Sequence, residues 1–437
     1  MTTHVFVIGL DDFNRRQLET IRNAEAYTFH GLLPYDMVVN PESYPIDEMI
    51  EEGRRELDQA GVPVHAIIGH WDFPTTALLA VFRRDLELSG PSLAATLIAD
   101  HKYWSRLREA RVIPDSVPDY QSLDPFDPQA EDKVELDFPF WIKPVIGFSS
   151  QMVYRVEDAW ELRDALSGIR QGIARFGDPF GRLMELAHLP ADIPAEIDAH
   201  HCVLEKPIDG WQCTLEGYIQ HGEVVVYGTV DSIREGALRS SFARYEFPSR
   251  LPGEIKDRMV AITEKAIRSL DLNDTPFNVE FFWDQESDRI WLLEVNTRIS
   301  KSHSPLFADV AGASHHEVAV DVALGRRPDF PRWEGEYNIS IKFMLRRFED
   351  GIVTRVPTPA EIEQLESEFP GTRIQVEVKE GDRLSELRGH EVYSFEVAVI
   401  FMGGQDHHEL ETRYRELVDR LPLEFRSVPG KGSGESR

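Results

Sequence analysis

The stretch 292-LLEVNTRISKSH-303 places a carboxylate, a carboxamide and a guanidinium directly after an apolar run. Such an apolar run is typical of a strand that packs in a sheet. Glu294 and Asn296 are two residues apart, so they lie on the same face of that strand. Ser-Lys-Ser-His follows in place of a turn. We therefore expect a charged ligand to be held where this strand ends.

The same strand is predicted to form one half of a β-hairpin. The runs 277–283 and 289–296 are strand-like, and they flank a turn-rich segment centred on Ser287. With Ser287 at the centre, Glu280 faces Glu294 across the pair. Like charges directly opposite each other destabilise an antiparallel sheet, so this pair calls for a compensating positive charge.

A divalent cation is the compensation that this pattern favours. Glu280, Glu294 and Asn296 would present three oxygen ligands on one patch of the hairpin. Few ligands, all of them oxygen, suit Mg²⁺ or Mn²⁺ better than zinc or a complete Ca²⁺ site. The alternative is a solvated strand face with a chance acidic pair.

Two further apolar strands end in charged residues. Lys143 ends the first, and a small Gly/Ser loop that contains Ser149 and Ser150 follows it. The lysine ammonium, the backbone N–H groups and the serine hydroxyls could bind phosphate. A lysine that reaches from a strand end into solvent is the alternative. Glu205 and Lys206 end the second strand.

Composition limits the partners and the cellular setting. Asp and Glu number 76 against 47 Lys and Arg, a formal net charge of -29, which argues against nucleic acid or an anionic membrane as a partner. The two cysteines, Cys202 and Cys213, predict no disulfide framework. The sequence also has no signal-like start and no run of about 18 apolar residues. We expect a soluble, cytoplasmic protein.

The order of predicted elements indicates several domains. Strand-like and helical segments alternate over residues 1–95, which predicts a parallel α/β domain. Residues 114–133 are rich in Pro and Asp and predict a loop, and residues 168–201 have no clear period and predict an irregular insertion. After residue 328 the pattern changes to that of a small β-rich domain closed by a helix over residues 409–421.

The chain resembles the ATP-grasp superfamily along nearly its whole length, in the order and spacing of Lys102, Lys143, residues 205–208, Glu280 and 294-EVNTR-298. The resemblance implies an α/β and α+β ATP-grasp fold in which ATP lies between two lobes. It divides the chain into an N-terminal Rossmann-like α/β domain (1–95), an ATP-grasp domain with its lobe hinge near 203–212 (96–330), a small C-terminal α+β domain (331–425) and a flexible tail (426–437).

The resemblance also implies a role for each candidate residue. The residues expected to bind ATP are Lys102, Lys143, Ser149, Ser150, Glu205, Lys206, Ile208 and Gln212. The two lysines would contact the phosphates, the hinge residues the adenine, and Gln212 the ribose. Glu280, Glu294 and Asn296 would bind Mg²⁺ or Mn²⁺, and Arg298 would steady the transferring phosphoryl group. These roles agree with phosphoryl transfer, which depends on positioned positive charge.

Several positions depart from individual families. The segment 294–303 resembles biotin carboxylase and carbamoyl phosphate synthetase most, but Ser302 stands where biotin carboxylase has the glutamate that serves as the base for bicarbonate. Gln151 and Met152 stand where Gly and Val are usual. The segment 381–404 is similar to the terminal domain of L-amino-acid ligases and carboxylases, and 70-HWDF-73 is similar to carboxylate-amine ligases.

The sequence leaves two possible roles open for Arg244 and for His303. Arg244 belongs to a loop expected over residues 234–252, where it either reaches the γ-phosphate as part of a lid or decorates an exposed loop. His303, a candidate catalytic residue with Arg298 and Lys143, either contacts substrate or packs as a satisfied histidine. The adjacent pairs 200–201, 315–316 and 407–408 are expected at the surface or in capping roles, because neighbouring side chains point in different directions.

These expectations combine into an ADP-forming carboxylate-amine ligase. ATP would phosphorylate a small carboxylate, with an amino acid favoured, and an amine would attack the acyl phosphate. The alternatives are a bicarbonate-dependent carboxylase of the biotin carboxylase type and a nucleotide-binding module without turnover. The expected partners are the small-molecule carboxylate and amine, and a homodimer is the commonest assembly for such an enzyme.

Overall fold

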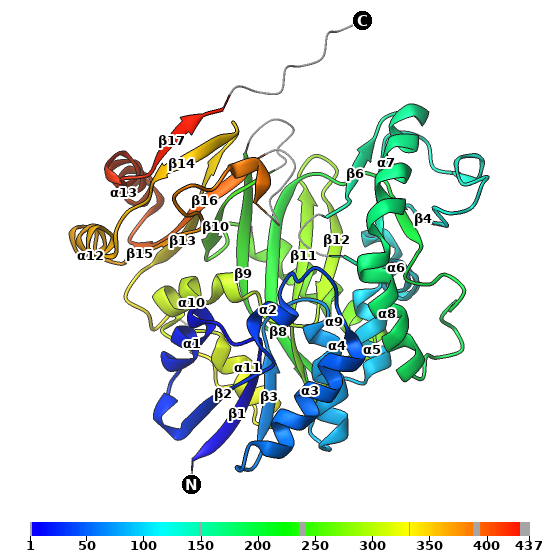
Figure 1. The fold of residues 1–437 in the computed structure, drawn as a ribbon, viewed down its shortest axis with the longest axis horizontal. Helices are drawn as coiled ribbons and strands as arrows, with labels where there is room; N and C mark the ends of the chain where they lie inside the picture. The colour runs from blue at the N-terminus through cyan, green and yellow to red at the C-terminus, as the bar shows by residue number, and fades with distance from the viewer. Residues whose placement is uncertain (1, 148–150, 236–240, 332, 388–393, 429–437) are drawn as a thin grey trace, which may run out of the picture. The chain divides into compact units, whose positions relative to one another are not determined.

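The computed structural model describes residues 2–147, 151–235, 241–331, 333–387 and 394–428. The chain divides into two compact units (Figure 1). The first unit contains Met1–Thr229, Leu251–Lys301 and His315–Phe330. The second unit contains Val230–Arg250, Ser302–Ser314 and Pro331–Arg437.

The first unit begins with a three-stranded parallel sheet in the order β2-β1-β3. Its strands are β1 (Thr3–Ile8), β2 (Tyr27–Leu32) and β3 (Ala66–Gly69). The helices around it are α1 (Asp12–Glu19), α2 (Tyr35–Val38), α3 (Ile46–Gln59), α4 (Thr75–Asp85) and α11 (His316–Ala323). Val5 and Val7 pack toward α1 and α11, whereas Phe6 and Ile8 join the opposite core. Burial on both faces explains why the strand is apolar throughout.

A four-stranded antiparallel sheet in the order β4-β7-β5-β6 follows within the first unit. It consists of β4 (Tyr120–Leu123), β5 (Phe140–Pro144), β6 (Tyr154–Val156) and β7 (Cys202–Glu205). The helices of this region are α5 (Leu93–Asp100), α6 (Lys102–Val112), α7 (Ala159–Gly172) and α8 (Ala174–Leu186).

Two of the sequence-based expectations for this region are wrong. Residues 168–201 are not irregular throughout, because α7 extends to Gly172 and α8 follows it. Pro179 lies inside α8 and obscures the helical pattern, although Phe176, Phe180 and Leu183 are buried at helical spacing. The loop expected over residues 114–133 contains the short strand β4, whose edge position explains its weak apolar pattern.

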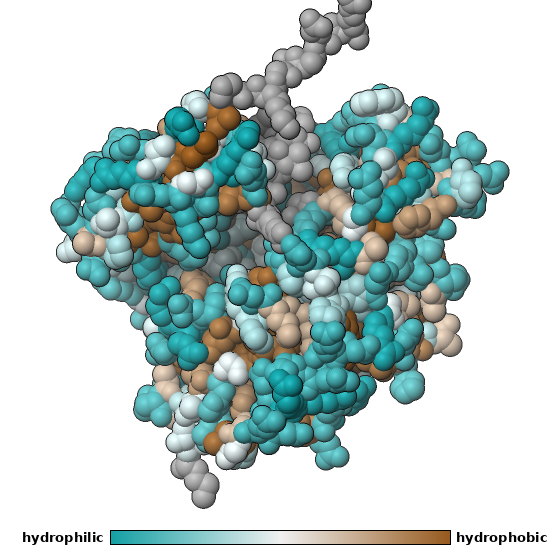
Figure 2. Space-filling model, viewed as in Figure 1, coloured by the Kyte–Doolittle hydropathy of each residue, from teal (hydrophilic) through white to brown (hydrophobic). Residues whose placement is uncertain are grey.

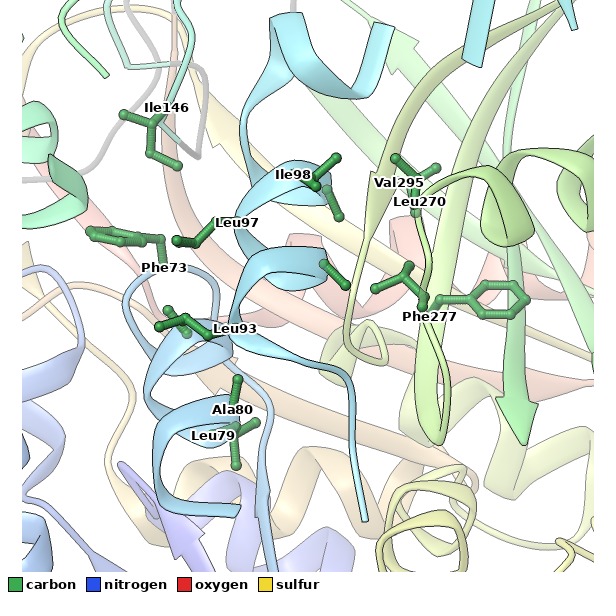
Figure 3. Packing of buried hydrophobic residues seen from close by; sticks show 14 of the residues in the cluster. Phe73, Leu79, Ala80, Leu93, Leu97, Ile98, Ile146, Leu270, Phe277 and Val295 are labelled. Atoms are coloured by element: carbon green, nitrogen blue, oxygen red, sulfur yellow. The ribbon is translucent and has the colours of Figure 1, made fainter. Parts of the chain in front are cut away.

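The largest sheet of the first unit contains β12-β11-β8-β9 in that order. The strands are β8 (Trp211–Gln220), β9 (Glu223–Glu235), β11 (Thr275–Asp284) and β12 (Arg289–Asn296), and helix α9 (Gly253–Ser269) precedes β11. The residues of β9 from Val230 on belong to the second unit. Figure 3 shows Leu79, Leu93 and Leu97 of α4 and α5 in the same buried cluster as Phe277 and Val295 of the hairpin. This shared core ties the N-terminal helices to the strands that carry the candidate site.

The second unit is built on the antiparallel strands β10-β13-β16-β15. Its strands are β10 (Ser241–Phe247), β13 (Ile339–Arg347), β14 (Gly351–Arg355), β15 (Thr372–Val376), β16 (Phe395–Gly404) and β17 (Glu424–Ser427). Its helices are α10 (Ser304–Ala311), α12 (Pro359–Glu368) and α13 (His407–Arg420). Residues 426 and 427, predicted as tail, belong to β17, which pairs with β14.

Hydrophilic residues cover most of the face drawn in Figure 2. This surface agrees with the large excess of acidic over basic residues in the sequence. Among the described residues, no helix combines the length and the apolar character that crossing a membrane requires.

Candidate active site

The predicted hairpin is formed by β11 and β12, and Glu280 faces Glu294 as expected. The expected register also holds for Asn278, which faces Asn296. Nearer the turn it shifts by one residue, so that Phe281 pairs with Leu292. Leu293 is therefore the extra residue of a β-bulge, a feature that no turn-centred count could reveal.

The three candidate metal ligands lie together at this end of the hairpin. Gln212 donates a hydrogen bond to Glu280, with 3.2 Å between Nε2 and Oε2. The side-chain nitrogen of Asn296 donates to Asn278 over 3.0 Å, which leaves the carbonyl oxygen of Asn296 as its ligand atom. Within the described residues, no three Asp, Glu, His or Cys side chains form a metal-binding group. Two carboxylates and one amide oxygen nevertheless fit Mg²⁺, which keeps several waters or phosphate oxygens.

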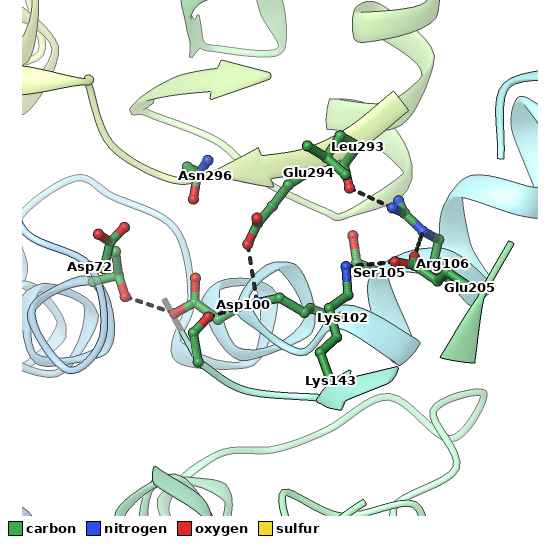
Figure 4. A network of polar contacts seen from close by, with 12 residues as sticks. Asp72, Asp100, Lys102, Ser105, Arg106, Lys143, Glu205, Leu293, Glu294 and Asn296 are labelled. Atoms are coloured by element: carbon green, nitrogen blue, oxygen red, sulfur yellow. Dashed lines mark hydrogen bonds and ion pairs between the residues drawn. The ribbon is translucent and has the colours of Figure 1, made fainter. Parts of the chain in front are cut away.

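Lys102 lies beside the hairpin, as Figure 4 shows. It begins α6, and its backbone N–H donates to Val145 over 2.8 Å. Its ammonium donates to the Gly147 carbonyl over 2.7 Å and lies 3.2 Å from Oε1 of Glu294. Burial alone would raise the pKa of Glu294, but nearby cations, led by Lys102, hold the pKa below its usual range. Glu294 is therefore ionised at neutral pH and can serve as a metal ligand.

A buried ion-pair network links Lys143 to the hairpin. Lys143 lies 2.5 Å from Oε2 of Glu205, and Arg106 lies 2.6 Å from Oε1 of the same carboxylate. Arg106 also pairs with Glu109 over 2.5 Å and donates to the carbonyl of the bulged residue Leu293. Burial would raise the pKa of Glu205, but Arg106 and Lys143 lower it to about 2. Arg106, which the sequence did not single out, thus joins α6, β7 and β12.

Some of the residues predicted to bind ATP form hydrogen bonds or ion pairs within the protein. Lys206 donates from its backbone to Asp119 over 2.9 Å. Ile208 lies half-buried in the connection between β7 and β8. Glu205 directs its carboxylate to the ion-pair network, so an adenine contact would have to come from its backbone. Ser149 and Ser150 lie outside the described residues. The nucleotide roles of all these residues stay predictions.

Arg298, the predicted partner of the phosphoryl group, is held by Asp72 from the segment after β3. Its Nε donates to Oδ1 of Asp72 over 2.6 Å, and its Nη2 contacts the same oxygen. Asp72 belongs to the 70-HWDF-73 motif, which the sequence pointed to without giving Asp72 a role. The sequence feature that could have suggested this pairing is the opposite charge of Asp72 and Arg298, each of which lies in a motif.

Residues 136–305 match the ATP-grasp domain family. The chain contains an ATP-grasp domain. The matched range includes Lys143, Glu280, Glu294 and Arg298, whereas Lys102 and Asp72 precede it. A segment of 156 residues is 22% identical to the C-terminal section of the carbamoyl phosphate synthase large chain of Methanopyrus kandleri. That segment covers 33% of this chain and 28% of the relative.

Solved structures with the ATP-grasp fold match almost the whole chain. L-amino acid ligase from Bacillus licheniformis has a TM-score of 0.70 and 17% identity, covering 98% of this chain and 99% of that one. Biotin carboxylase from Campylobacter jejuni, in a β,γ-ATP complex, has a TM-score of 0.62 and 14% identity, covering 96% and 92%. At these identities the likeness shows the fold, and the predicted ATP-grasp fold is confirmed.

Shortly after Arg298 in the sequence, buried groups contact both the N–H and the carbonyl of Ser300. The Ser300 N–H points at the Glu216 carboxylate, 3.3 Å from Oε1. The Ser300 carbonyl lies 3.0 Å from Nε2 of His315, whose Nδ1 is 3.2 Å from the Tyr227 hydroxyl. This arrangement fixes the path of the chain directly after the predicted phosphoryl contact.

The surface position expected for His315 and His316 is wrong, and the alternative capping role is not found at the start of α11, where His315 forms no side-chain capping hydrogen bond. Both are fully buried, and Nε2 of His316 lies 2.8 Å from the Asn14 side-chain oxygen. The reason is that α11 is buried on nearly all sides, so two adjacent side chains that point in different directions both meet protein.

Arg244 and His303 belong to the second unit. Arg244 is in β10, not in a loop, and its Nε lies 2.6 Å from the buried carboxylate of Glu246. The prediction of a loop over residues 234–252 is therefore wrong for residues 241–247, which form β10. His303 is buried and packs edge-on against Tyr245, with 4.9 Å between ring centroids. Their proposed contacts with phosphate and substrate stay predictions.

The buried Glu216 gives the protein a pH-dependent stability that can be measured. Burial raises the pKa of Glu216 from 4.5 to about 7. The folded protein therefore keeps a proton that the unfolded chain releases near pH 4.5, and stability falls as pH rises from about 4.5 to 7. In Glu216→Gln we expect this fall to be smaller than in the unchanged protein, as measured by urea unfolding at pH 4.5, 6 and 8, while Asp100, whose pKa burial also raises to about 7, keeps its own contribution.

The control is Glu223→Gln, which changes an exposed glutamate. Its curve of unfolding free energy against pH should run parallel to that of the unchanged protein. Parallel curves for Glu216→Gln as well would show that Glu216 does not hold a proton in the folded state.

Proposed function

We propose that the protein is an ATP- and Mg²⁺-dependent ligase that activates a small carboxylate as an acyl phosphate for attack by an amine. The observation that carries this proposal is the Glu280–Glu294 pair with Asn296 beside it, bordered by Lys102 and Arg298. Phosphoryl transfer depends on positioning and on neutralising spread negative charge. A site with two carboxylates for a cation and several fixed cations meets both needs.

The reaction has two steps. A carboxylate oxygen of the substrate attacks the γ-phosphorus of ATP, the bond to the β–γ bridging oxygen breaks, and ADP leaves. An amine then attacks the carbonyl carbon, phosphate leaves with the electron pair of the C–O bond, and the amine proton passes to solvent. The products are an amide or peptide bond, ADP and phosphate.

The chain supplies fixed charges to these steps. Lys102 and Lys143 bind phosphate oxygens, and their present carboxylate partners keep both ammonium groups oriented. Arg298 binds the transferring phosphoryl group, oriented by Asp72. Glu280, Glu294 and Asn296 hold the Mg²⁺, which when bound would neutralise charge on the phosphates. The fold shared with an L-amino acid ligase and with an ATP-bound biotin carboxylase supports this assignment.

The proposal is tested by mixing the full chain with ATP, Mg²⁺ and a panel of amino-acid pairs. We expect phosphate release that requires both the carboxylate and the amine, and a condensation product by mass spectrometry. Phosphate release that needs only bicarbonate would favour a carboxylase instead. Nucleotide binding without turnover across the whole panel would contradict the ligase and favour a binding module.

A further inference from the structure

The Asp72–Arg298 pair uses only one of the two carboxylate oxygens of Asp72. Both contacts of Arg298, from Nε at 2.6 Å and from Nη2, go to Oδ1. No described residue donates a hydrogen bond to Oδ2 of Asp72. The Asp72 side chain is 33% exposed, compared with 17% for Arg298. A second cationic group can therefore reach Asp72 while Arg298 stays in place.

The other carboxylates near this pair are already engaged. Asp100 accepts a hydrogen bond from Thr76 over 2.7 Å, and burial raises the pKa of Asp100 to about 7. Glu216 is fully buried and faces the Ser300 N–H. Glu294 pairs with Lys102, and Glu280, the remaining carboxylate close enough to influence Arg298, accepts a hydrogen bond from Gln212. Figure 4 shows Asp72 in the same region as Asp100, Glu294 and Asn296. Asp72 is thus the carboxylate best placed to receive a cation from a ligand.

We propose that Asp72 binds the α-ammonium group of an α-amino acid whose carboxylate lies against Arg298. This inference rests on the proposed ligase function and specifies the substrate that is activated. In an α-amino acid the nitrogen lies about 2.5 Å from the carboxylate carbon. The negative Asp72 and the positive Arg298, held in direct contact, match a ligand whose two opposite charges are equally close.

The charge pattern also selects against other carboxylates. Bicarbonate or a simple carboxylic acid presents only negative charge, and near Asp72 that charge has an unfavourable interaction. An amino acid replaces this repulsion with an attraction in a partly buried site. An ammonium held by Asp72 keeps its proton and is not a nucleophile. The attacking amine therefore comes from a second molecule.

The experiment compares amino acids with their deamino analogues. Hydroxylamine serves as the amine, because it converts an acyl phosphate into a hydroxamate that can be quantified. The pairs are L-alanine with propanoate and L-phenylalanine with 3-phenylpropanoate. In the unchanged protein, we expect the amino acid of at least one pair to have a kcat/KM at least about 100-fold above that of its analogue, equivalent to about 2.7 kcal/mol.

The decisive variant is Asp72→Asn, which keeps an oxygen that can accept from Arg298 but loses the charge. We expect the ratio of kcat/KM for the amino acid to kcat/KM for its deamino analogue to fall about 100-fold, because any loss of Arg298 orientation lowers both members of a pair alike and cancels in the ratio. Asp85→Asn is the matched control, because Asp85 forms an exposed pair with Arg54 over 2.6 Å in the same sequence region. Asp85→Asn should leave the ratio of kcat/KM for the amino acid to kcat/KM for its analogue unchanged.

The outcomes separate this inference from the proposed function. If no carboxylate in a broad panel yields hydroxamate or phosphate, the ligase function itself fails. If carboxylates are activated but Asp72→Asn lowers both members of a pair equally, Asp72 only positions Arg298 and the inference is wrong. If Asp72→Asn does not fold, the unchanged protein still tests the inference. Equal kcat/KM for the amino acid and its deamino analogue in every pair would overturn it.

Discussion

Glu294→Ala is expected to lower ATP-dependent phosphate release by roughly 10²- to 10³-fold, the range seen when one preorganised electrostatic contact is lost from an active site. Glu294 faces Glu280 across the hairpin and pairs with Lys102 over 3.2 Å. Its removal leaves the proposed cation with one carboxylate and leaves Lys102 without its partner on β12. The measurement is the initial rate of phosphate release at saturating ATP and Mg²⁺.

Nucleotide binding distinguishes lost chemistry from lost structure. ADP binding without metal, measured by calorimetry, should persist in Glu294→Ala, because Glu294 is not among the residues expected to contact the adenine. Glu286→Ala is the control on the same hairpin, since Glu286 is exposed in the turn between β11 and β12. Full phosphate release by Glu294→Ala would refute the role of this hairpin in holding Mg²⁺.

Arg106→Met is expected to lower the free energy of unfolding by about 3–5 kcal/mol, the cost of removing one partner from buried ion pairs. Arg106 is buried and pairs with Glu205 and Glu109, and it also satisfies the carbonyl of the bulged Leu293. The substitution leaves the two carboxylates and the carbonyl without this donor. Denaturant unfolding at neutral pH measures the change.

The matched control is Arg54→Met, which removes the exposed pair between Arg54 and Asp85. A surface pair of this kind contributes about 1 kcal/mol or less. If the two substitutions have equal effects, the network around Arg106 is not a significant source of stability. The double change Arg106→Met with Glu109→Gln should recover part of the loss, because one buried charge no longer lacks a partner.

How far the sequence predicted the site depended on the distance between the residues involved. The facing of Glu280 and Glu294 follows from strand alternation and one turn, and it is confirmed. The bulge at Leu293 was not predicted, because its carbonyl is held by Arg106, which is 187 residues away along the chain. Burial of His315 and His316 was missed for a similar reason, since it depends on what packs around α11.

By itself, the sequence determined the β11–β12 hairpin, the shared face of Glu294 and Asn296 and the resemblance to ATP-grasp proteins, because these follow from local patterns and motif order. Only the tertiary structure decided that Arg106 pairs with Glu205 and Arg298 with Asp72, across 99 and 226 residues. Such pairs form because buried elements pack together and a buried charge needs a partner. No local pattern specifies which distant charge that partner is.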